Sequence, residues 1–238
     1  MGMIRVSNLK PRAALLVVGL LATLLVLALS ACGSGGSAQE EAKARPLPET
    51  PQELRPGEYR SEAFKPSVSF HVGTGWATSK PETSDYLEMQ WGEQGGLAFT
   101  NVQKVSKPIY KPTETNTPKL VEAPEDLVGW FQNHPYLKTS KPEPVTVGGV
   151  KGVQIDVLVE DLPQDVYGRC GVECVDIAPL SGGERDVFFK EANKRRVIVL
   201  EDVKGETVYI DFSTPVVLFD KFAPEAQKVV DSVKWGGS

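Results

Sequence analysis

The chain has 238 residues, of which 41% are hydrophobic and 24% are charged, and its formal net charge is −5. Residues 1–31 contain three basic residues and no acidic one, so the remaining 23 Lys and Arg face 31 Asp and Glu, a net charge of −8. This acidic balance argues against binding to nucleic acid and against electrostatic attraction to anionic lipid headgroups. The length after a short N-terminal segment suits one domain with its own core.

The N-terminal segment has the layout of an export signal. Three basic residues precede an uncharged apolar stretch at residues 13–29, and small residues follow it. This order is typical of a secretory signal peptide. The tetrapeptide Leu29-Ser30-Ala31-Cys32 resembles the lipobox of bacterial lipoproteins. The resemblance implies cleavage before Cys32, attachment of a diacylglycerol to its thiol, frequent acylation of the new amine by a fatty acid such as palmitate, and anchorage at the extracytoplasmic face of the cell membrane.

A retained membrane anchor is the alternative, because 17 uncharged residues are near the lower limit for a spanning helix. The Gly/Ser run at residues 33–37 favours the lipoprotein interpretation, since retained segments usually end in basic residues. We therefore expect a signal peptide at residues 1–31 and a lipid-anchored flexible linker at 32–57. Its four prolines, at 46, 48, 51 and 56, should extend the second half of that linker. A single globular α+β domain should occupy 58–235.

The first part of this domain has the alternation of β-strands. Residues 68–72, 86–91 and 97–102 alternate apolar and polar side chains, and glycine-rich turns separate them. His71 lies on the polar side of its strand, which favours a solvent-facing side chain over a functional one.

Residues 106–124 contain four prolines and show no periodicity. A segment of this length without secondary structure is usually either functional or disordered, and the sequence leaves both open. As a binding loop it would contact a partner through Tyr110, an amphipathic anchor, with Lys107 and Lys111 beside it.

Two segments have helical patterns. Ala-Pro-Glu at 123–125 predicts the start of a helix whose apolar face includes Leu127 and Phe131, and Asn133-His134-Pro135 predicts its end. His134 is thereby interpreted as a helix-end residue rather than a catalytic base. Ala-Pro-Glu recurs at 223–225 in the closing segment 219–235, which we expect to lie across the sheet on the apolar stripe Phe222, Ala226, Val229, Val230 and Val233. Between the helices, strands are predicted at 144–147, 153–159, 186–190, 196–203 and 206–213.

Besides Cys32, the chain has two cysteines, Cys170 and Cys174. Export to an oxidising compartment favours a disulfide between them, and four residues of separation permit its geometry. A metal site completed by His71 or His134, and free thiols, are the alternatives. The metal site is disfavoured because structural zinc sites usually repeat close ligand pairs.

The strand Val-Ser-Phe-His-Val before Gly-Thr-Gly-Trp, at 68–76, resembles the opening of the PsbP-like fold. The end of the chain is similar too: Gly-Glu-Thr-Val-Tyr-Ile-Asp-Phe, a proline-containing link, then a helix closing on Asp-Ser-Val-Lys-Trp. The resemblance covers 58–235 and implies an antiparallel β-sheet packed by two main helices, a PsbP-like α/β/α sandwich. It also implies a binding or assembly role without a catalytic centre.

The sequence lacks common catalytic motifs such as Gly-x-Ser-x-Gly and His-Glu-x-x-His. We therefore expect a non-catalytic binding or assembly module of the cell envelope, with a protein or envelope-component partner, no cofactor, no metal and no nucleic acid. The alternative is an envelope carrier of lipid or another hydrophobic ligand, built as a half-barrel. That alternative requires a concave apolar sheet face that no helix fills; an enzyme is the weakest interpretation.

Overall fold

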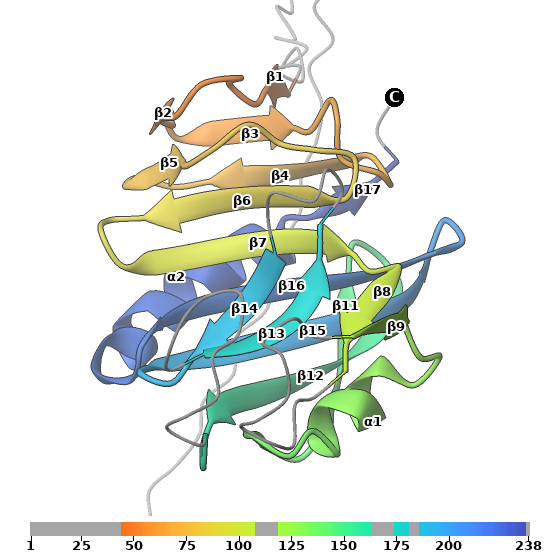
Figure 1. The fold of residues 1–238 in the computed structure, drawn as a ribbon. Coiled ribbons are helices and arrows are strands. Elements are labelled where there is room, and N and C mark those ends of the chain that lie inside the picture. Colours follow the sequence, from red (N-terminus) through yellow and green to blue (C-terminus); the bar gives the residue numbers. More distant parts are fainter. Residues whose placement is uncertain (1–43, 108–118, 163–173, 181–185, 237–238) are drawn as a thin grey trace, which may run out of the picture. The chain divides into compact units, whose positions relative to one another are not determined.

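The computed structural model describes residues 44–107, 119–162, 174–180 and 186–236. Within these residues, nine strands form one antiparallel sheet in the order β10-β12-β15-β16-β7-β6-β5-β2, and β11 shares with β10 the outer edge of β12 (Figure 1). The bounds are β2 Gln52–Glu53, β5 Trp76–Thr78, β6 Tyr86–Trp91, β7 Gly95–Asn101, β10 Leu137–Thr139, β11 Glu143–Val147, β12 Val150–Val159, β15 Asn193–Val203 and β16 Glu206–Pro215.

Four shorter strands form a second sheet in the order β1-β3-β4-β17. They are β1 Arg45–Pro46, β3 Gly57–Arg60, β4 Val68–Val72 and β17 Lys234–Trp235, and only the β1–β3 pair is parallel. Strands β4 and β6 have the bounds that the alternation of side chains predicted. The other predicted strands are confirmed too, with ends shifted by a few residues.

Both faces of the central strands are covered, so the described residues have two hydrophobic cores. On β7, Leu97 and Phe99 belong to the first core, while Ala98 between them belongs to the second. This follows from the period of two in a strand, which sends successive side chains to opposite faces. Strands between two covers lose the polar-outward pattern, which is why β7 is buried almost throughout.

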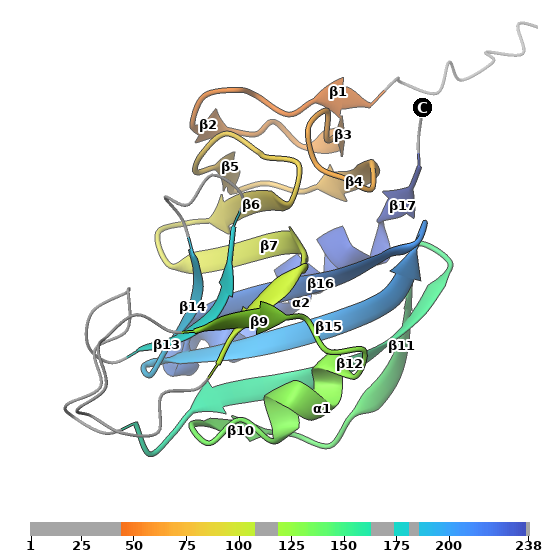
Figure 2. The same ribbon diagram turned by 45° about the vertical axis from the view of Figure 1, so that its right-hand side comes forward.

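Helix α2, Phe219–Asp231, covers the face of the first core (Figures 1 and 2). The predicted apolar stripe is confirmed, since Phe222, Ala226, Val229 and Val230 are buried in the helix and Val233 just after it. However, Ala-Pro-Glu does not open the helix, because Pro224 lies inside it. The 3-10 turn η1, Val216–Leu218, leads directly from β16 into α2. Burial of Phe219 and Phe222, worth about 1.5–3 kcal/mol each, offsets the hydrogen bond that the proline removes.

The prediction of two main helices in an α/β/α sandwich is wrong for the described residues. Helix α1, Leu127–Gln132, has only six residues and begins after Asp126, whose Oδ1 accepts from the Gly129 N–H at 2.7 Å. The Ala123 N–H donates to the Gln103 carbonyl, which keeps Ala-Pro-Glu outside the helix. Two β-ribbons complete the cover of this face: β8 Lys104–Ser106 with β9 Leu120–Glu122, and β13 Cys174–Pro179 with β14 Asp186–Lys190 (Figure 2).

The segment predicted to be the second half of a linker packs on the sheets instead. Leu47 and Leu54 are buried in the first core, and the Leu54 N–H donates to the Trp76 carbonyl at 2.8 Å. The guanidinium of Arg45 donates to the carbonyls of Arg55 and Pro56. The prolines of this segment therefore shape a packed edge, and the ordered domain begins before the predicted start at residue 58. Residues 1–43, which include the predicted signal peptide and the first part of the linker, lie outside the described residues.

The predicted loop at 106–124 is also shorter than expected. Its last part forms β9, which pairs with β8 through the register Val105 to Val121. The Lys107 N–H donates to the Lys119 carbonyl at 2.7 Å, so the hairpin continues past the strands. Val105 of β8 is fully buried, whereas Leu120 and Val121 of β9 are exposed, so β9 is held by its backbone pairing with β8.

The half-barrel alternative is contradicted. A carrier of that kind needs one apolar sheet face that nothing fills, whereas α2 fills one face, and α1 with the two ribbons covers the other. No helix among the described residues is long and apolar enough to span a membrane.

Candidate functional site

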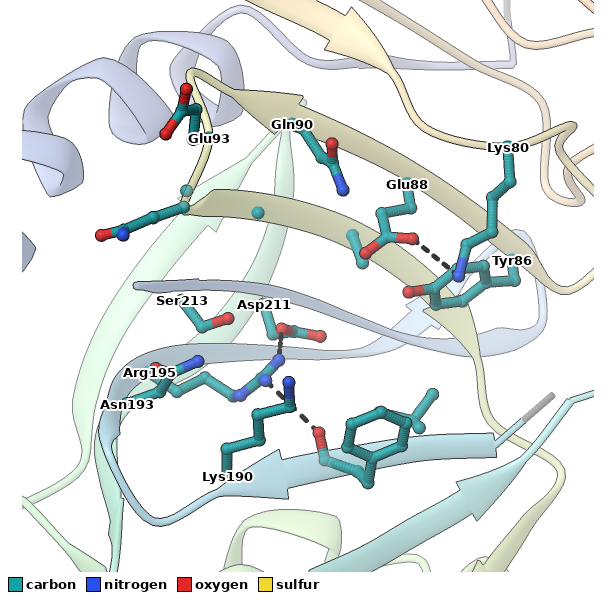
Figure 3. A pocket seen from close by; sticks show the side chains of 16 residues that line it. Lys80, Tyr86, Glu88, Gln90, Glu93, Lys190, Asn193, Arg195, Asp211 and Ser213 are labelled. Atoms are coloured by element: carbon teal, nitrogen blue, oxygen red, sulfur yellow. Dashed lines mark hydrogen bonds and ion pairs between the residues drawn. The ribbon is translucent and has the colours of Figure 1, made fainter. Parts of the chain in front are cut away.

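A polar cavity of about 250 Å³ lies on the sheet face opposite α2, between the sheet and strand β14 (Figure 3). We call it the ribbon pocket, because the β13–β14 ribbon bounds it on one side. Four neighbouring strands of the sheet, the β6–β7 hairpin and Lys80 of the β5–β6 connection supply the rest of the lining. The residues are Lys80, Tyr86, Glu88, Gln90, Glu93, Gln94, Gly95, Gly96, Ala98, Val187, Phe188, Lys190, Asn193, Arg195, Asp211 and Ser213.

The hollow exists because small residues meet at the centre of the sheet. Gly96 pairs with Ser213, and Ala98 with Asp211, in the β7–β16 register. A Cβ placed on Gly96 would meet no atom within 4 Å, so this position opens into free space. A Cβ on the preceding Gly95 would meet the Phe222 ring at 2.7 Å on the other face. Gly95 is thus required by the packing of α2, whereas Gly96 leaves room in the ribbon pocket.

A buried ion pair forms part of the pocket lining. Arg195 of β15 is paired with Oδ1 of Asp211 on β16 (Figure 3). Arg195 also donates to the Phe188 carbonyl at 3.4 Å and lies 4.1 Å from the centre of the Phe189 ring. These contacts hold the guanidinium between the sheet and the ribbon. The pair therefore links the two walls of the pocket.

The second carboxylate oxygen of Asp211 has no such partner. Asp211 is 2% exposed, and its Oδ2 forms no hydrogen bond with any described residue. Burial raises the pKa of Asp211, although the charge and hydrogen bond of Arg195 act in the opposite direction. An acceptor that is buried without a donor is costly, because it has lost its hydration. This oxygen is sealed from the solvent-accessible space, so the cost is part of the stability of the fold.

A second ion pair lies at strand β6, on the sheet side of the pocket. Lys80 contacts Glu88 at 2.6 Å, and its ammonium lies 4.5 Å from the centre of the Tyr86 ring (Figure 3). Glu88 also accepts from the Ser79 hydroxyl at 3.2 Å. Burial, and after it the charge of Glu88, raises the pKa of Tyr86 well above its usual value. Tyr86 is therefore a neutral phenol at physiological pH.

These groups can bind a small polar molecule. The basic groups of Lys80 and Arg195 are each in contact with a carboxylate. Among the described residues, no group of three or more His, Cys, Asp or Glu side chains could hold a metal ion. The arrangement offers fixed hydrogen-bonding groups around a hollow.

Most of the predicted site residues cannot be placed. Cys32, Tyr110, Lys111 and Cys170 lie outside the described residues, so lipidation at Cys32, binding through the 106–124 loop and the disulfide stay predictions. Cys174 begins β13 and is buried. Lys107 is exposed next to the β8–β9 hairpin, where its backbone N–H donates to the Lys119 carbonyl.

The two histidines have different surroundings. The His71 side chain is half exposed and lies 3.5 Å from Glu58, in agreement with its predicted solvent-facing position. His134 follows α1 as predicted, but it is buried, with 4% exposed. Its Nδ1 accepts from the Tyr136 N–H at 3.3 Å, and burial lowers the pKa of His134 to about 4. Neither histidine lines the ribbon pocket.

Sequence analysis missed the ribbon pocket. One signal was present: Asp211 is a charged residue within the strand Val208 to Phe212, at a position that shares a face with the buried Tyr209. A carboxylate inside such a strand needs a partner, and Arg195 supplies it from the neighbouring strand. The sequence of β7 does not show which of the glycines at 95 and 96 faces α2 and which faces the pocket. That depends on how β7 pairs with its neighbouring strands.

The fold and the pocket define an α+β protein with a small polar site on a sheet face. No protein-family model and no curated protein matches the chain.

Two solved structures are similar to it. LpqN, involved in cell envelope biogenesis of Mycobacterium tuberculosis, has 8% identity and a TM-score of 0.37, over 79% of this chain and 91% of its own. Cyanobacterial PsbP (CyanoP) from Synechocystis has 11% identity and a TM-score of 0.39, over 77% of this chain and 95% of its own. The second belongs to the family that the sequence motifs resemble. At these identities and TM-scores, neither similarity carries an inference about function.

Proposed function

We propose that this protein is a non-catalytic binding module, held at the extracytoplasmic face of the cell membrane by lipid on Cys32, and that the ribbon pocket is its ligand site. The lipobox supports the location, and the pocket supports the binding role. The partner is a component of the envelope that presents a small polar group to the pocket.

The observation that carries this proposal is the hollow at Gly96, lined by the buried ion pair of Arg195 and Asp211. Burying an ion pair such as Arg195–Asp211 contributes little net stability, because desolvation of the two charges cancels most of their attraction. Well-packed apolar side chains at these positions would stabilise the sheet at least as well. A polar hollow in the middle of a sheet is therefore better explained by binding than by stability.

Binding rather than catalysis is supported by the way the charged groups are held. Arg195 is fixed by Asp211, the Phe188 carbonyl and the Phe189 ring, and Lys80 is fixed by Glu88. A nucleophile or general base needs a group that can gain or release a proton near neutral pH. The fixed pairs of the ribbon pocket instead provide a pre-organised surface, which lowers the entropy lost on binding.

A thermal-shift experiment tests the proposal. The full chain, purified with its lipid and placed in lipid nanodiscs, is heated with and without the small-molecule fraction of an envelope digest. A ligand that binds only the folded state raises Tm, and the rise grows with the logarithm of the ratio of its concentration to Kd. The variant Gly96→Leu places a side chain in the hollow, where its Cβ meets no atom within 4 Å, so it should lose this rise in Tm.

The matched control is Gly73→Leu. Gly73 also has open space around its Cβ and lies outside the pocket, so this variant should keep the rise in Tm. An equal rise in Gly96→Leu and the unmodified chain would contradict the proposal, as would the absence of a rise in both. Circular dichroism of the variants without extract checks that each is folded.

A further inference from the structure

We infer that the ribbon pocket binds a single neutral sugar ring, a monosaccharide or the end unit of a glycan. This inference rests on the proposed function and names the chemical class of its ligand. Four observations carry it: the charge balance of the lining, its hydrogen-bonding groups, an aromatic side chain and the volume.

The charges of the described lining cancel. Glu88, Glu93 and Asp211 are acidic, and Lys80, Lys190 and Arg195 are basic. Two of these carboxylates are already in contact with two of the cations. A ligand with a net charge would therefore compete with an existing ion pair, whereas a neutral ligand leaves both pairs intact. The balance favours a neutral, polar molecule.

The hydrogen-bonding groups favour hydroxyls. Gln90, Gln94, Asn193 and Ser213 each offer both a donor and an acceptor. A hydroxyl group also donates and accepts, so a ring bearing several hydroxyls matches this lining. A molecule with donors only, such as an alkyl ammonium ion, would leave the donors of these amides without acceptors.

The lining also has one apolar surface that a sugar can use. Phe188 of β14 lines the pocket and is only partly buried, although it belongs to the ribbon that covers the second core. A pyranose ring has hydrophilic edges and C–H faces, so one face can remove apolar surface of Phe188 from water. Gly96 and Ala98, which also line the pocket, have no side chain beyond a methyl group. They leave room for a ring that contacts Phe188.

The volume sets the size of the ligand. About 250 Å³ lies just below the range of about 300–1,000 Å³ of the pockets that hold drug-sized ligands. The cavity therefore suits a smaller molecule, such as one hexose. A disaccharide would extend out of the pocket. Ligands of this size, held mainly by hydrogen bonds, reach dissociation constants of about 1 mM.

Saturation-transfer NMR tests the inference with pure compounds. The full chain in nanodiscs is mixed separately with glucose, galactose, mannose and N-acetylglucosamine, and with ethanolamine and glycine as charged probes of smaller size. At least one sugar should receive saturation from the protein, with a dissociation constant of about 1–10 mM. Gly96→Leu should weaken that binding at least tenfold, Gly96→Ala less, and Gly73→Leu should leave it unchanged.

Several outcomes would overturn the inference. The inference fails if none of the four sugars receives saturation at about ten times the expected dissociation constant. It also fails if ethanolamine or glycine binds in their place. Sugar binding that persists in Gly96→Leu would place the site elsewhere. If the sugars are silent but the envelope digest still gives a Gly96-dependent rise in Tm, only the sugar assignment fails, and the proposed binding role remains.

Discussion

Burial of His134 predicts that the protein loses stability in mild acid. The imidazole lies between Trp130 and Tyr136, with ring-centre distances of 5.2 and 5.9 Å. Its Nδ1 accepts a hydrogen bond from the Tyr136 N–H, which requires that nitrogen to be unprotonated. Burial lowers the pKa of His134 from 6.5 to about 4. The folded chain therefore resists a protonation that the unfolded chain accepts.

The sign and size of the effect follow from proton linkage. Because the pKa is lowered in the folded state, the unfolded chain binds more protons between pH 6.5 and 4. The contribution of His134 is fully present above pH 6.5 and is lost as the pH falls toward 4. At about 1.4 kcal/mol for each pKa unit, the free energy of unfolding should fall by about 2 kcal/mol between pH 7 and 5, and by about 3 kcal/mol in total at pH 4.

Urea unfolding at pH 7, 6 and 5 measures this loss, and His134→Gln isolates the histidine. The variant is less stable at pH 7 because packing is lost, but its stability should fall less with pH. The gap between the two proteins should narrow by about 2 kcal/mol from pH 7 to pH 5.

The other histidine of the chain provides the control. His71→Gln is the matched variant, because it exchanges a histidine for glutamine at a half-exposed position. A proton NMR titration gives the pKa of His134 directly. A gap that stays constant with pH, or a measured pKa near 6.5, would refute the reasoning.

Four further predictions are independent of His134. Asp156→Asn should cost about 1–2 kcal/mol at pH 7, measured by urea unfolding, because Asp156 is partly buried and contacts Arg196 at 2.7 Å and Lys194 at 2.9 Å. Burial raises the pKa of Asp156, but Arg196 and Lys194 lower it by more, so the net effect is a lowered pKa. The contribution of Asp156 to stability is therefore present above pH 3.8 and is lost as the pH falls below that value. The Asp156→Asn variant should not show this loss. Mass spectrometry of the membrane-extracted N-terminus should find lipid on Cys32 and no lipid in Cys32→Ala, whereas an unmodified Cys32 within an intact signal would support the retained anchor. Cys170 and Cys174 should resist thiol labelling in the exported, denatured protein until a reductant is added, and full labelling without it would contradict a disulfide. Replacing residues 108–118 by a short Gly/Ser turn should leave Tm nearly unchanged, since Lys107 and Lys119 are already hydrogen-bonded, but should reduce partner crosslinking at least tenfold; unchanged crosslinking would exclude this loop as a contact.

The strands were predictable because period-two alternation is a local property of the chain. Val68–Val72 reads as a strand from its own five residues, and the structure has the same bounds. The apolar stripe of α2 was predictable for the same reason, since its spacing of three and four residues is visible without the sheet.

The starts of the helices were not predictable by local rules. In both Ala-Pro-Glu segments the local preference of proline for a first turn is overruled by tertiary contacts. At 223–225, burial of Phe219 and Phe222 extends the helix to before the proline. At 123–125, pairing of Ala123 with Gln103 keeps the chain extended until Asp126. A proline rule ranks backbone preferences, which are smaller than the burial of one aromatic side chain.

The prolines of the 44–56 segment misled for a related reason. A proline-rich, polar sequence is what an extended spacer has, but the same residues suit the edge of a sheet, where a missing N–H costs nothing. The difference lies in two leucines, Leu47 and Leu54, which are buried in the first core. In this polar segment, the two isolated leucines therefore predict packing on the core better than the prolines predict an extended spacer.

The ribbon pocket could not be predicted, because no part of it is local. Its floor comes from the pairing of Gly96 with Ser213, and its buried charge from the meeting of Arg195 with Asp211, residues that belong to three different strands. A shift of one residue in the β7–β16 register would turn Gly96 toward α2 and Gly95 toward the pocket. The burial of Leu97 and Phe99 in the first core excludes that shift, because it would turn both side chains to the other face. The packing of β7 on one face thus fixes the register that opens the hollow at Gly96 on the other.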